Sequence, residues 1–302
     1  MFSKYRYYLL LHLIIVLFGF TGILGKLINL PAEAIVWYRV FIAFIGLGVV
    51  MFLMRIPFKL ASVKSLVQIG LVGVVVGLHW ITFYESIQLS TASFGILCLS
   101  TTTLHVAWLE PLILKRPFSF VKLLLGFVVI FGIYFVSEDF SPQEYRALFF
   151  GLCSALLAAL FTVFNLKFAD SVLPLKISFY EMVIAFFFIT LMLTVKNDGF
   201  GGFFNLDLSD VLWLLFLGLI CTSFAFWAII EVIKRLGAFT ASLSINLEPV
   251  YTIILAVFIL KENEVLGFRF YVGAAVIILV VIINALIGSV SNNRNFDDKD
   301  AV

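Results

Sequence analysis

The stretch LGAFTASLSINLEPVYTIILAVFILKEN, residues 236–263, decides the fold. It is an apolar run long enough to cross a bilayer, since a hydrocarbon core of about 30 Å takes roughly 20 helical residues. Glu248 is its buried carboxylate, and counted from Ala238 it lies about 15 Å deep, near the midplane. A charge there costs about 2.5 to 3.5 kcal/mol on insertion scales. We therefore expect Glu248 to face a protein interior or a wet cavity.

The residues around Glu248 indicate which way it faces. Ser244, Glu248 and Thr252 recur every four residues and so share one face of a helix. Such a polar stripe faces other helices or a solute, not lipid. Pro249 donates no N–H, so we expect it to free the carbonyl of Ile245. Two interpretations of Glu248 stay open: a structural carboxylate, hydrogen-bonded within a bundle, or a carboxylate that lines a solute pathway. We favour the second.

The composition of all 302 residues indicates an integral membrane protein. Hydrophobic residues make up 63% and charged residues 13%, whereas soluble proteins carry about 25% charged residues. There is no basic patch that would bind nucleic acid. The three cysteines lie in apolar runs, and their spacing supports neither a disulfide framework nor a zinc site. We expect no cofactor and no metal.

Ten apolar segments are long enough to span a bilayer with some tilt. They cover residues 7–25, 35–54, 64–86, 91–114, 120–137, 146–168, 176–195, 211–231, 240–260 and 269–288. The turns between them are short, and no span contains an aspartate. The sequence therefore predicts an all-α integral membrane protein with ten transmembrane helices.

The basic residues predict the orientation. Of the 20 Lys and Arg residues, fourteen fall in loops on one side and five on the other, with Arg39 inside a span. Cytoplasmic loops carry the excess of Lys and Arg. We therefore expect both termini to be cytoplasmic, in a multi-pass protein of the plasma membrane, the bacterial inner membrane.

The two halves of the sequence repeat. Trp37-Tyr38-Arg39 aligns with Phe179-Tyr180-Glu181. At an offset of 146 residues the aligned pairs are Glu85 with Glu231, Thr102 with Glu248, and Lys115 with Lys261. Five spans per half is an odd number, so the second copy must enter the membrane upside down.

This repeat predicts the domain organisation. We expect two inverted five-helix repeats, residues 1–140 and 141–290, followed by a disordered cytoplasmic tail at 291–302. Secondary transporters are built on this plan, with their sites near the midplane between the repeats.

The motifs also resemble a known family. Asn246-Leu-Glu-Pro-Val-Tyr-Thr, followed by Leu260-Lys-Glu262 and an apolar final span, resembles the late signature of the EamA-type transporters of the drug/metabolite transporter superfamily. Arg39 at the start of span two, and Ser100-Thr-Thr-Thr ahead of Leu114-Lys-Arg116, extend the resemblance to the first half. It covers about residues 7 to 288. It implies ten helices in two inverted halves and the movement of small organic solutes such as amino acids or related metabolites, with export as the expected direction.

The first half departs from the family pattern in two places. Thr102 and Thr103 stand where the second half has Glu248 and Pro249, and Arg116 replaces the acidic residue of the Lys-Glu pair. We therefore do not expect two equivalent sites.

Several polar residues are candidates to contact the solute. We expect contacts from Glu248 and Asn246, with Thr102 opposite them across the pseudo-symmetry axis. Arg39 can bind a substrate carboxylate in a bidentate fork, or pair with Glu85 as a structural contact.

Histidines and aromatic residues complete the candidate site. His79 and His105 lie near the middle of spans three and four, where each can change charge near neutral pH and take part in proton coupling, or remain a neutral hydrogen-bonding group. Aromatic side chains form apolar walls with polar tips. The remaining candidates to line the cavity are Trp80, Trp227, Tyr251 and Asn165.

We predict a secondary transporter that works by alternating access between its halves. Its expected partners are a small-molecule substrate and the lipid bilayer, with no nucleic acid, and it is expected to be a monomer or a weak homodimer. One alternative is an intramembrane enzyme acting on a lipid or small amphipathic substrate, but the histidines are scattered, so we predict no catalytic residue. The other is a passive channel, but channel filters are commonly rings in oligomers.

Overall fold

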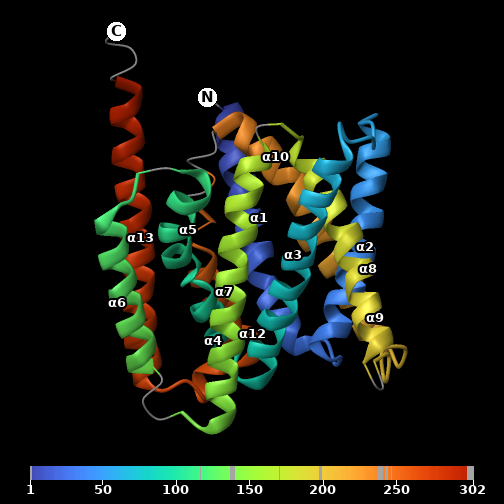
Figure 1. The fold of residues 1–302 in the computed structure, drawn as a ribbon. Helices are drawn as coiled ribbons and strands as arrows, with labels where there is room; N and C mark the ends of the chain where they lie inside the picture. The colour runs from blue at the N-terminus through green and yellow to red at the C-terminus, as the bar shows by residue number, and fades with distance from the viewer. Residues whose placement is uncertain are drawn as a thin grey trace.

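The computed structural model describes residues 2–115, 117–136, 140–169, 171–196, 199–236, 241, 244–245 and 247–297. Within these residues every regular element is a helix (Figure 1). The first half contains α1 (Phe2–Leu27), α2 (Ala32–Leu53), α3 (Val63–Leu89), α4 (Ala92–Leu99), α5 (Thr102–Leu114) and α6 (Phe120–Val136). The second half contains α7 (Pro142–Ala169), α8 (Pro174–Val195), α9 (Leu208–Leu215), the π-helix η1 (Phe216–Phe224), α10 (Ala225–Leu236), α12 (Glu248–Leu260), the short η2 (Glu262–Glu264) and α13 (Phe268–Asp297).

The all-α class is confirmed. Within the described residues, seven helical stretches are long and apolar enough to cross a membrane. Three shorter apolar helices, Leu124–Val136, Glu248–Leu260 and Phe268–Ile283, stand beside them. Each of the ten predicted segments overlaps a helix.

The fourth and ninth predicted segments are both interrupted. α4 ends at Leu99 and α5 begins at Thr102, while α12 begins at Glu248 after a turn at Leu247. Thr101 and Leu247, the residues just before α5 and α12, have similar backbone angles: φ −69° and ψ −8° against φ −82° and ψ −7°. Pro249 lies in the first turn of α12, where a missing N–H removes no intrahelical bond. It therefore begins a helix and does not kink a continuous one.

α5 and α12 also end alike. Their C-caps, Lys115 and Lys261, adopt the left-handed conformation with φ 54° and 55°. These lysines are a pair that the offset of 146 residues aligns. The sequence repeat is therefore accompanied by equivalent backbone conformations at both ends of these helices.

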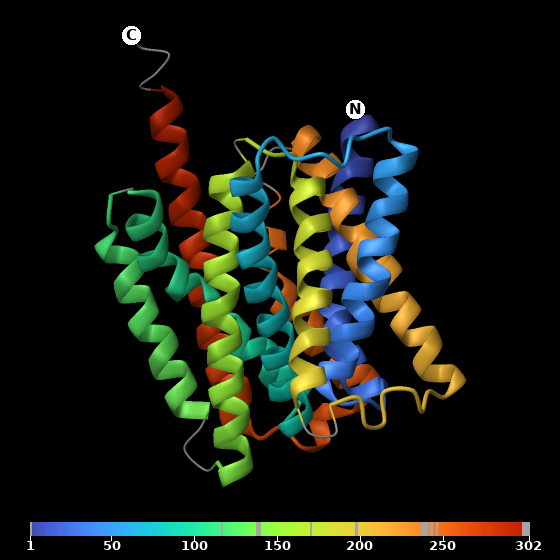
Figure 2. The ribbon, with the colours of Figure 1, turned by 45° about the vertical axis from the view of Figure 1, so that its right-hand side comes forward.

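The helix packing places α3 centrally, against α7 and α8 (Figures 1 and 2). Contacts recur between the halves: α3 packs on α7 as α10 packs on α1, and α5 packs on α7 as α12 packs on α1. α6 and α13 pack together at one edge of the bundle. The first turn of α1 and the last turn of α13 lie at the same end of the molecule.

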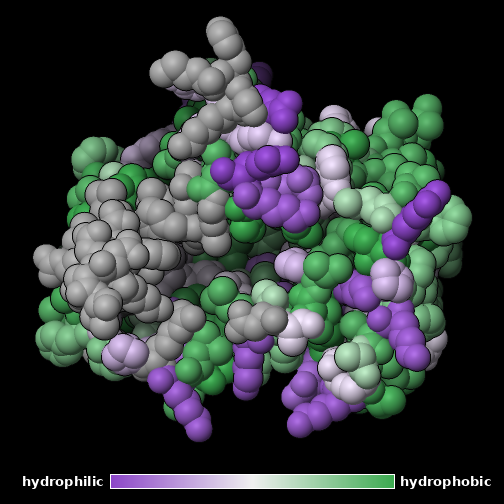
Figure 3. All heavy atoms as spheres, turned by 90° about the horizontal axis from the view of Figure 1, so that it is seen from above, coloured by the Kyte–Doolittle hydropathy of each residue, from purple (hydrophilic) through white to green (hydrophobic). Residues whose placement is uncertain are grey.

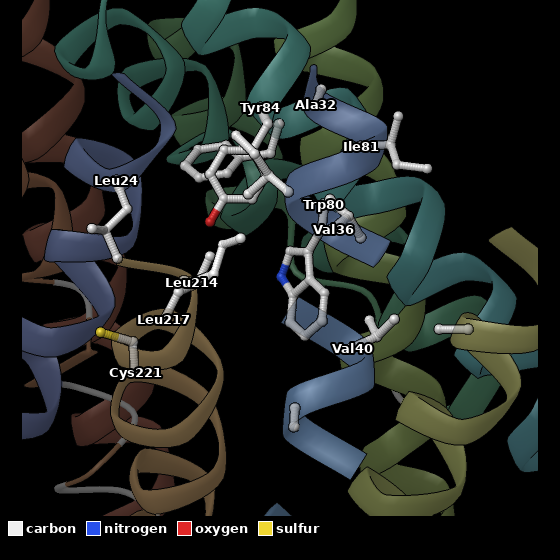
Figure 4. Close-up of a cluster of buried hydrophobic side chains, with 14 of the residues drawn as sticks. Leu24, Ala32, Val36, Val40, Trp80, Ile81, Tyr84, Leu214, Leu217 and Cys221 are labelled. Carbon is white, nitrogen blue, oxygen red and sulfur yellow. The ribbon is translucent and has the colours of Figure 1, made fainter. Parts of the chain in front are cut away.

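The largest cluster of buried apolar side chains joins α1, α2, α3 and α8 with η1. In Figure 4, Trp80 and Tyr84 project from α3 between Val36 and Val40 of α2 and the side formed by Leu24 and Cys221. This packing fixes the inner side of α3, from which the site is built.

Candidate functional site

A cavity of about 510 Å³ opens at the end of the molecule where both termini lie. Its mouth is formed by Met54 and Ile56 after α2, Pro174 at the start of α8, and Glu231 and Lys234 near the end of α10. Figure 3 looks down on this end and shows a hollow among hydrophobic side chains. A cavity of this size is in the range of small-molecule sites.

Aromatic side chains make up much of the deeper wall. They come from four helices: Phe18 of α1, Trp80 of α3, Phe161 of α7, and Phe226 and Trp227 of α10. Two of the residues that the sequence marked as candidates, Trp80 and Trp227, are in this wall. A third candidate, Asn165 of α7, also lines the cavity.

Glu181 of α8 is the acidic residue in the interior of this cavity, and only 3% of it is exposed. The Asn165 side chain is close enough to this carboxyl group to interact with it. Three buried polar atoms here have no hydrogen-bond partner: Oε1 of Glu181, Oδ1 of Asn165 and Nε1 of Trp227. A buried polar atom left unpaired costs about 1 to 3 kcal/mol. The three residues that carry these atoms all line the cavity, as expected for a binding site.

Glu181 was not among the site residues predicted from the sequence, although one signal was present. The repeat aligned it with Arg39, and both are charged residues inside apolar spans, which are functional candidates. Its position depends on Gly73 of α3, where a Cβ would lie 2.7 Å from the backbone oxygen of Glu181. This close approach of α3 and α8 was not readable from sequence.

Arg39 lies beside the cavity wall and is 4% exposed. Its Nε donates to Oγ1 of Thr222 at 3.1 Å and its Nη1 donates to the Tyr84 hydroxyl at 3.3 Å. Its Cζ lies 3.8 Å from the centroid of the Trp80 ring. The structure thus holds Arg39 by these three side chains and not by Glu85.

Glu248 is partly buried, and its carboxyl group is close enough to Arg39 for a charge–charge interaction. It is not among the residues that line the cavity; Ile245, one turn before it, is. Asn246, the other expected polar contact, lies outside the described residues. The lining of this cavity therefore comes largely from α7, α8 and α10, and a solute contact at Glu248 stays a prediction.

The other candidates make hydrogen bonds within the bundle. Thr102 donates to the Leu99 carbonyl at 2.6 Å. Nδ1 of His79 lies 2.9 Å from Oγ of Ser154, and the ring is 5% exposed.

Two candidates remain on other faces. The Tyr251 hydroxyl lies 3.0 Å from Nδ1 of His12. His105 lies edge-on to Trp108, with ring centroids 6.4 Å apart, and its Nδ1 has no partner. Neither lines the cavity around Glu181.

At the opposite end of the molecule, polar contacts hold helix ends and turns together. The Glu262 carboxylate accepts from the backbone N–H of Ala92 at 2.7 Å and of Ser93 at 2.9 Å, and so caps the start of α4. Nζ of Lys26 donates to the Ser90 carbonyl at 2.6 Å. Asp210 accepts from the Asn29 N–H at 2.9 Å.

Asp210 corrects one expectation from sequence. It lies in the first turn of α9, within the candidate span Leu208–Leu236, so the prediction that no span contains an aspartate is wrong. Its role there is that of a hydrogen-bond acceptor for the α1–α2 turn. Within the described part of the chain, no three His, Cys, Asp or Glu residues are grouped to hold a metal ion.

Comparison with known proteins identifies the family. The model of the EamA-like transporter family matches residues 6–138 and 145–286. The chain belongs to the EamA-like transporter family. Two relatives are named only as transporters of unknown character. One, from Clostridium kluyveri (strain ATCC 8527 / DSM 555 / NBRC 12016 / NCIMB 10680 / K1), is 25% identical over 236 residues, which is 71% of each chain.

The other relative is the uncharacterized transporter YdfC of Bacillus subtilis (strain 168), 25% identical over 246 residues, 79% of this chain and 77% of its own. A solved crystal structure aligns with a TM-score of 0.64 at 12% identity, covering 94% of this chain and 98% of the other. At that identity it shows a shared fold alone. The helices around Glu181 are therefore part of an EamA-type membrane fold.

Proposed function

We propose that this EamA-family protein is a secondary transporter of small organic solutes, such as amino acids or related metabolites, and that it works by alternating access between two inverted five-helix repeats. The observation that carries the proposal is the cavity of about 510 Å³ with aromatic walls and three unpaired polar atoms. It is deep, apolar and open at one end, as expected for a solute site reached from one side of a membrane.

Two further features support the inverted repeats. The interruptions before Thr102 and Glu248 fall at aligned positions, and the helix contacts of one half recur in the other. Paired discontinuous helices are a feature of secondary transporters. Because both proposed repeats lie within one chain, we propose that a monomer suffices for transport.

The proposed direction is export. The mouth of the cavity lies at the end of the molecule that carries both termini, which the excess of Lys and Arg assigns to the cytoplasm. In this conformation a solute would therefore reach the cavity from the cytoplasm, which is the side where an exporter loads. Fluorescence of a green fluorescent protein fused to the C-terminus checks this orientation, since that reporter does not fold after export through the Sec pathway; a dark fusion present in the membrane would contradict it.

A binding screen followed by a transport assay tests the function. Purified protein is screened by thermal stabilisation against amino acids, nucleosides, organic acids and amines; a ligand at about 100 times its Kd raises the stability by roughly 2.7 kcal/mol. The selected solute is then loaded into proteoliposomes, and exchange of labelled solute is measured. Saturable exchange supports a carrier, whereas conductance far above carrier turnover indicates a channel.

A matched pair of variants tests whether the selected solute binds in this cavity. Trp227→Phe keeps the ring but removes the unpaired Nε1–H donor, and we expect weaker binding of the selected solute. Trp213→Phe is the control, since Trp213 packs against Phe20 outside the cavity. Equal affinity in both variants would remove Trp227 from the binding site.

A further inference from the structure

We infer that the cavity selects solutes that carry an amine, bound as an ammonium group by Glu181 and Asn165, and that it does not need a carboxylate on the solute. This inference rests on the proposed transport function and specifies its substrate class. It follows from which hydrogen-bonding atoms are left unpaired, from the charges around the cavity and from the aromatic walls.

The unpaired atoms of Glu181 and Asn165 are both acceptors. The Asn165 and Glu181 side chains line the same cavity and are close enough to interact. What remains without a partner is Oε1 of Glu181 and Oδ1 of Asn165. An ammonium group offers three donors and no acceptor. It can therefore donate to oxygens of this kind, whereas a carboxylate would place more acceptors beside them.

The charges lining the cavity point the same way. Glu181, Glu231 and Lys234 are its charged lining residues, and Nζ of Lys234 pairs with Oε1 of Glu231 at 2.7 Å near the mouth. Among the described residues, Lys196–Glu33 and Lys234–Glu231 form ion pairs, and neither involves Glu181. A buried carboxylate with no cation beside it favours a ligand that supplies one.

Arg39 does not supply a cation for a solute carboxylate. Its guanidinium lies over the Trp80 ring and donates to Thr222 and Tyr84, so it is already engaged, and it does not line the cavity. The carboxylate of a zwitterionic solute would thus be desolvated among aromatic rings without an ionic partner, which is unfavourable. This separates an amine from an amino acid.

The walls suit the rest of such a solute. Trp80, Phe161 and Trp227 surround the deeper cavity, and aromatic faces attract ammonium groups while their rings bury an apolar body. The cavity of about 510 Å³ is large enough for an aryl or alkyl amine. The ligand class is therefore an organic amine with an apolar body.

Three compounds of nearly one shape test the inference on the full-length purified protein: phenethylamine, phenethyl alcohol and phenylacetate, with phenylalanine as the zwitterion. Binding is measured by thermal stabilisation and calorimetry. We expect phenethylamine to bind at least tenfold more tightly than each of the other three. A tighter fit of phenylacetate or phenylalanine, or equal binding of all four, would overturn the inference.

Variants then assign the preference to Glu181. Glu181→Gln keeps the shape and removes the charge, and we expect at least a tenfold loss of phenethylamine affinity with that of phenethyl alcohol unchanged. Glu85→Gln is the control, a partly buried carboxylate of α3 outside the cavity. Retention of the amine preference in Glu181→Gln would contradict the assignment. If that variant does not fold, Glu181→Asp replaces it, with the order of ligands expected to persist at lower affinity.

The failure of this inference is distinguishable from failure of the transport proposal. If the broad screen yields an anionic or neutral solute that exchanges across proteoliposomes while amines do not bind, transport stands and the amine class is wrong. If no solute of any charge exchanges, the transport function itself is wrong.

Discussion

At the scale of single residues, Arg39 and Glu181 show two ways of keeping a charge inside a membrane protein. The sequence repeat aligns them, and both are almost fully buried. Arg39 has its donors directed to Thr222 and Tyr84 and its charge over Trp80. Glu181 keeps one carboxyl oxygen unpaired beside a cavity. We therefore propose a structural role for Arg39 and a binding role for Glu181.

This difference predicts that Arg39 mainly stabilises the fold. We expect Arg39→Gln to lower the free energy of unfolding by about 2 kcal/mol or more, because it removes a buried cation–π contact and two hydrogen bonds from a charged donor. Thermal unfolding in detergent measures this. Arg146→Gln, at an exposed position of α7, is the control and should change stability by no more than about 0.5 kcal/mol. A variant of normal stability that loses acidic ligands alone would instead make Arg39 a binding residue.

Some of the residues that line the cavity were predictable from the sequence. Trp80 and Trp227 were predicted to line the cavity as aromatic residues near polar positions, and Asn165 was a further candidate. The structure places all three around one cavity. Glu248 and Glu181 look alike in sequence, since each is a carboxylate inside an apolar run. Which of them faces the cavity depends on how the helices turn against one another, and a single helical period does not contain that information.

At the scale of helices, the contact between α3 and α8 sets the position of Glu181. A Cβ on Gly73 would lie 2.7 Å from the backbone oxygen and 2.9 Å from the Cα of Glu181. Only a residue without a side chain permits this approach. The glycine spacing in span three predicted close helix packing, but it did not show that the packing partner is α8.

Gly73→Ala therefore forces the two backbones apart. We expect it to destabilise the protein by about 1 to 3 kcal/mol, as overpacking does, and to weaken solute binding by displacing Glu181. Gly70→Ala is the matched control one turn earlier, since its Cβ would meet the Ile184 side chain at an ordinary 3.4 Å. Unfolding temperature and ligand affinity are compared for the two variants. Equal effects would show that the approach at Gly73 is not what positions Glu181.

The interrupted helices were partly predictable at this scale. The offset of 146 residues aligned Thr102 with Glu248, and both begin a helix. The Thr102 hydroxyl donates to the Leu99 carbonyl. This bond was not predictable from the sequence, because it depends on the interruption of the helix between α4 and α5. Backbone equivalence between the halves therefore does not imply equivalent chemistry.

At the scale of the whole molecule, the two ends differ. The end with the termini carries the mouth of the cavity, while the opposite end is held by Glu262 on the start of α4, by Lys26 on the end of α3 and by Asp210 on the α1–α2 turn. The residue aligned with Glu262 in the first half is Arg116, and an arginine cannot accept hydrogen bonds. This acceptor is thus encoded in one half only, which favours closure of the end opposite the termini.

Glu262→Gln tests this asymmetry. The substitution removes the charge and one of two acceptors, and losing a charge-assisted hydrogen bond costs about 1.5 kcal/mol, or roughly tenfold in the balance between closed and open states. Ile28 lies near the end of the molecule opposite the termini and is only 3% exposed. The variant Ile28→Cys, made in a chain whose native cysteines are replaced by alanine, therefore reports opening of this end. We expect a membrane-impermeant maleimide to label Ile28→Cys several times faster with Glu262→Gln. Glu264→Gln, exposed on the same short helix, is the control and should leave labelling unchanged. Unchanged labelling in both would mean that the Glu262 cap holds α4 without holding this end closed.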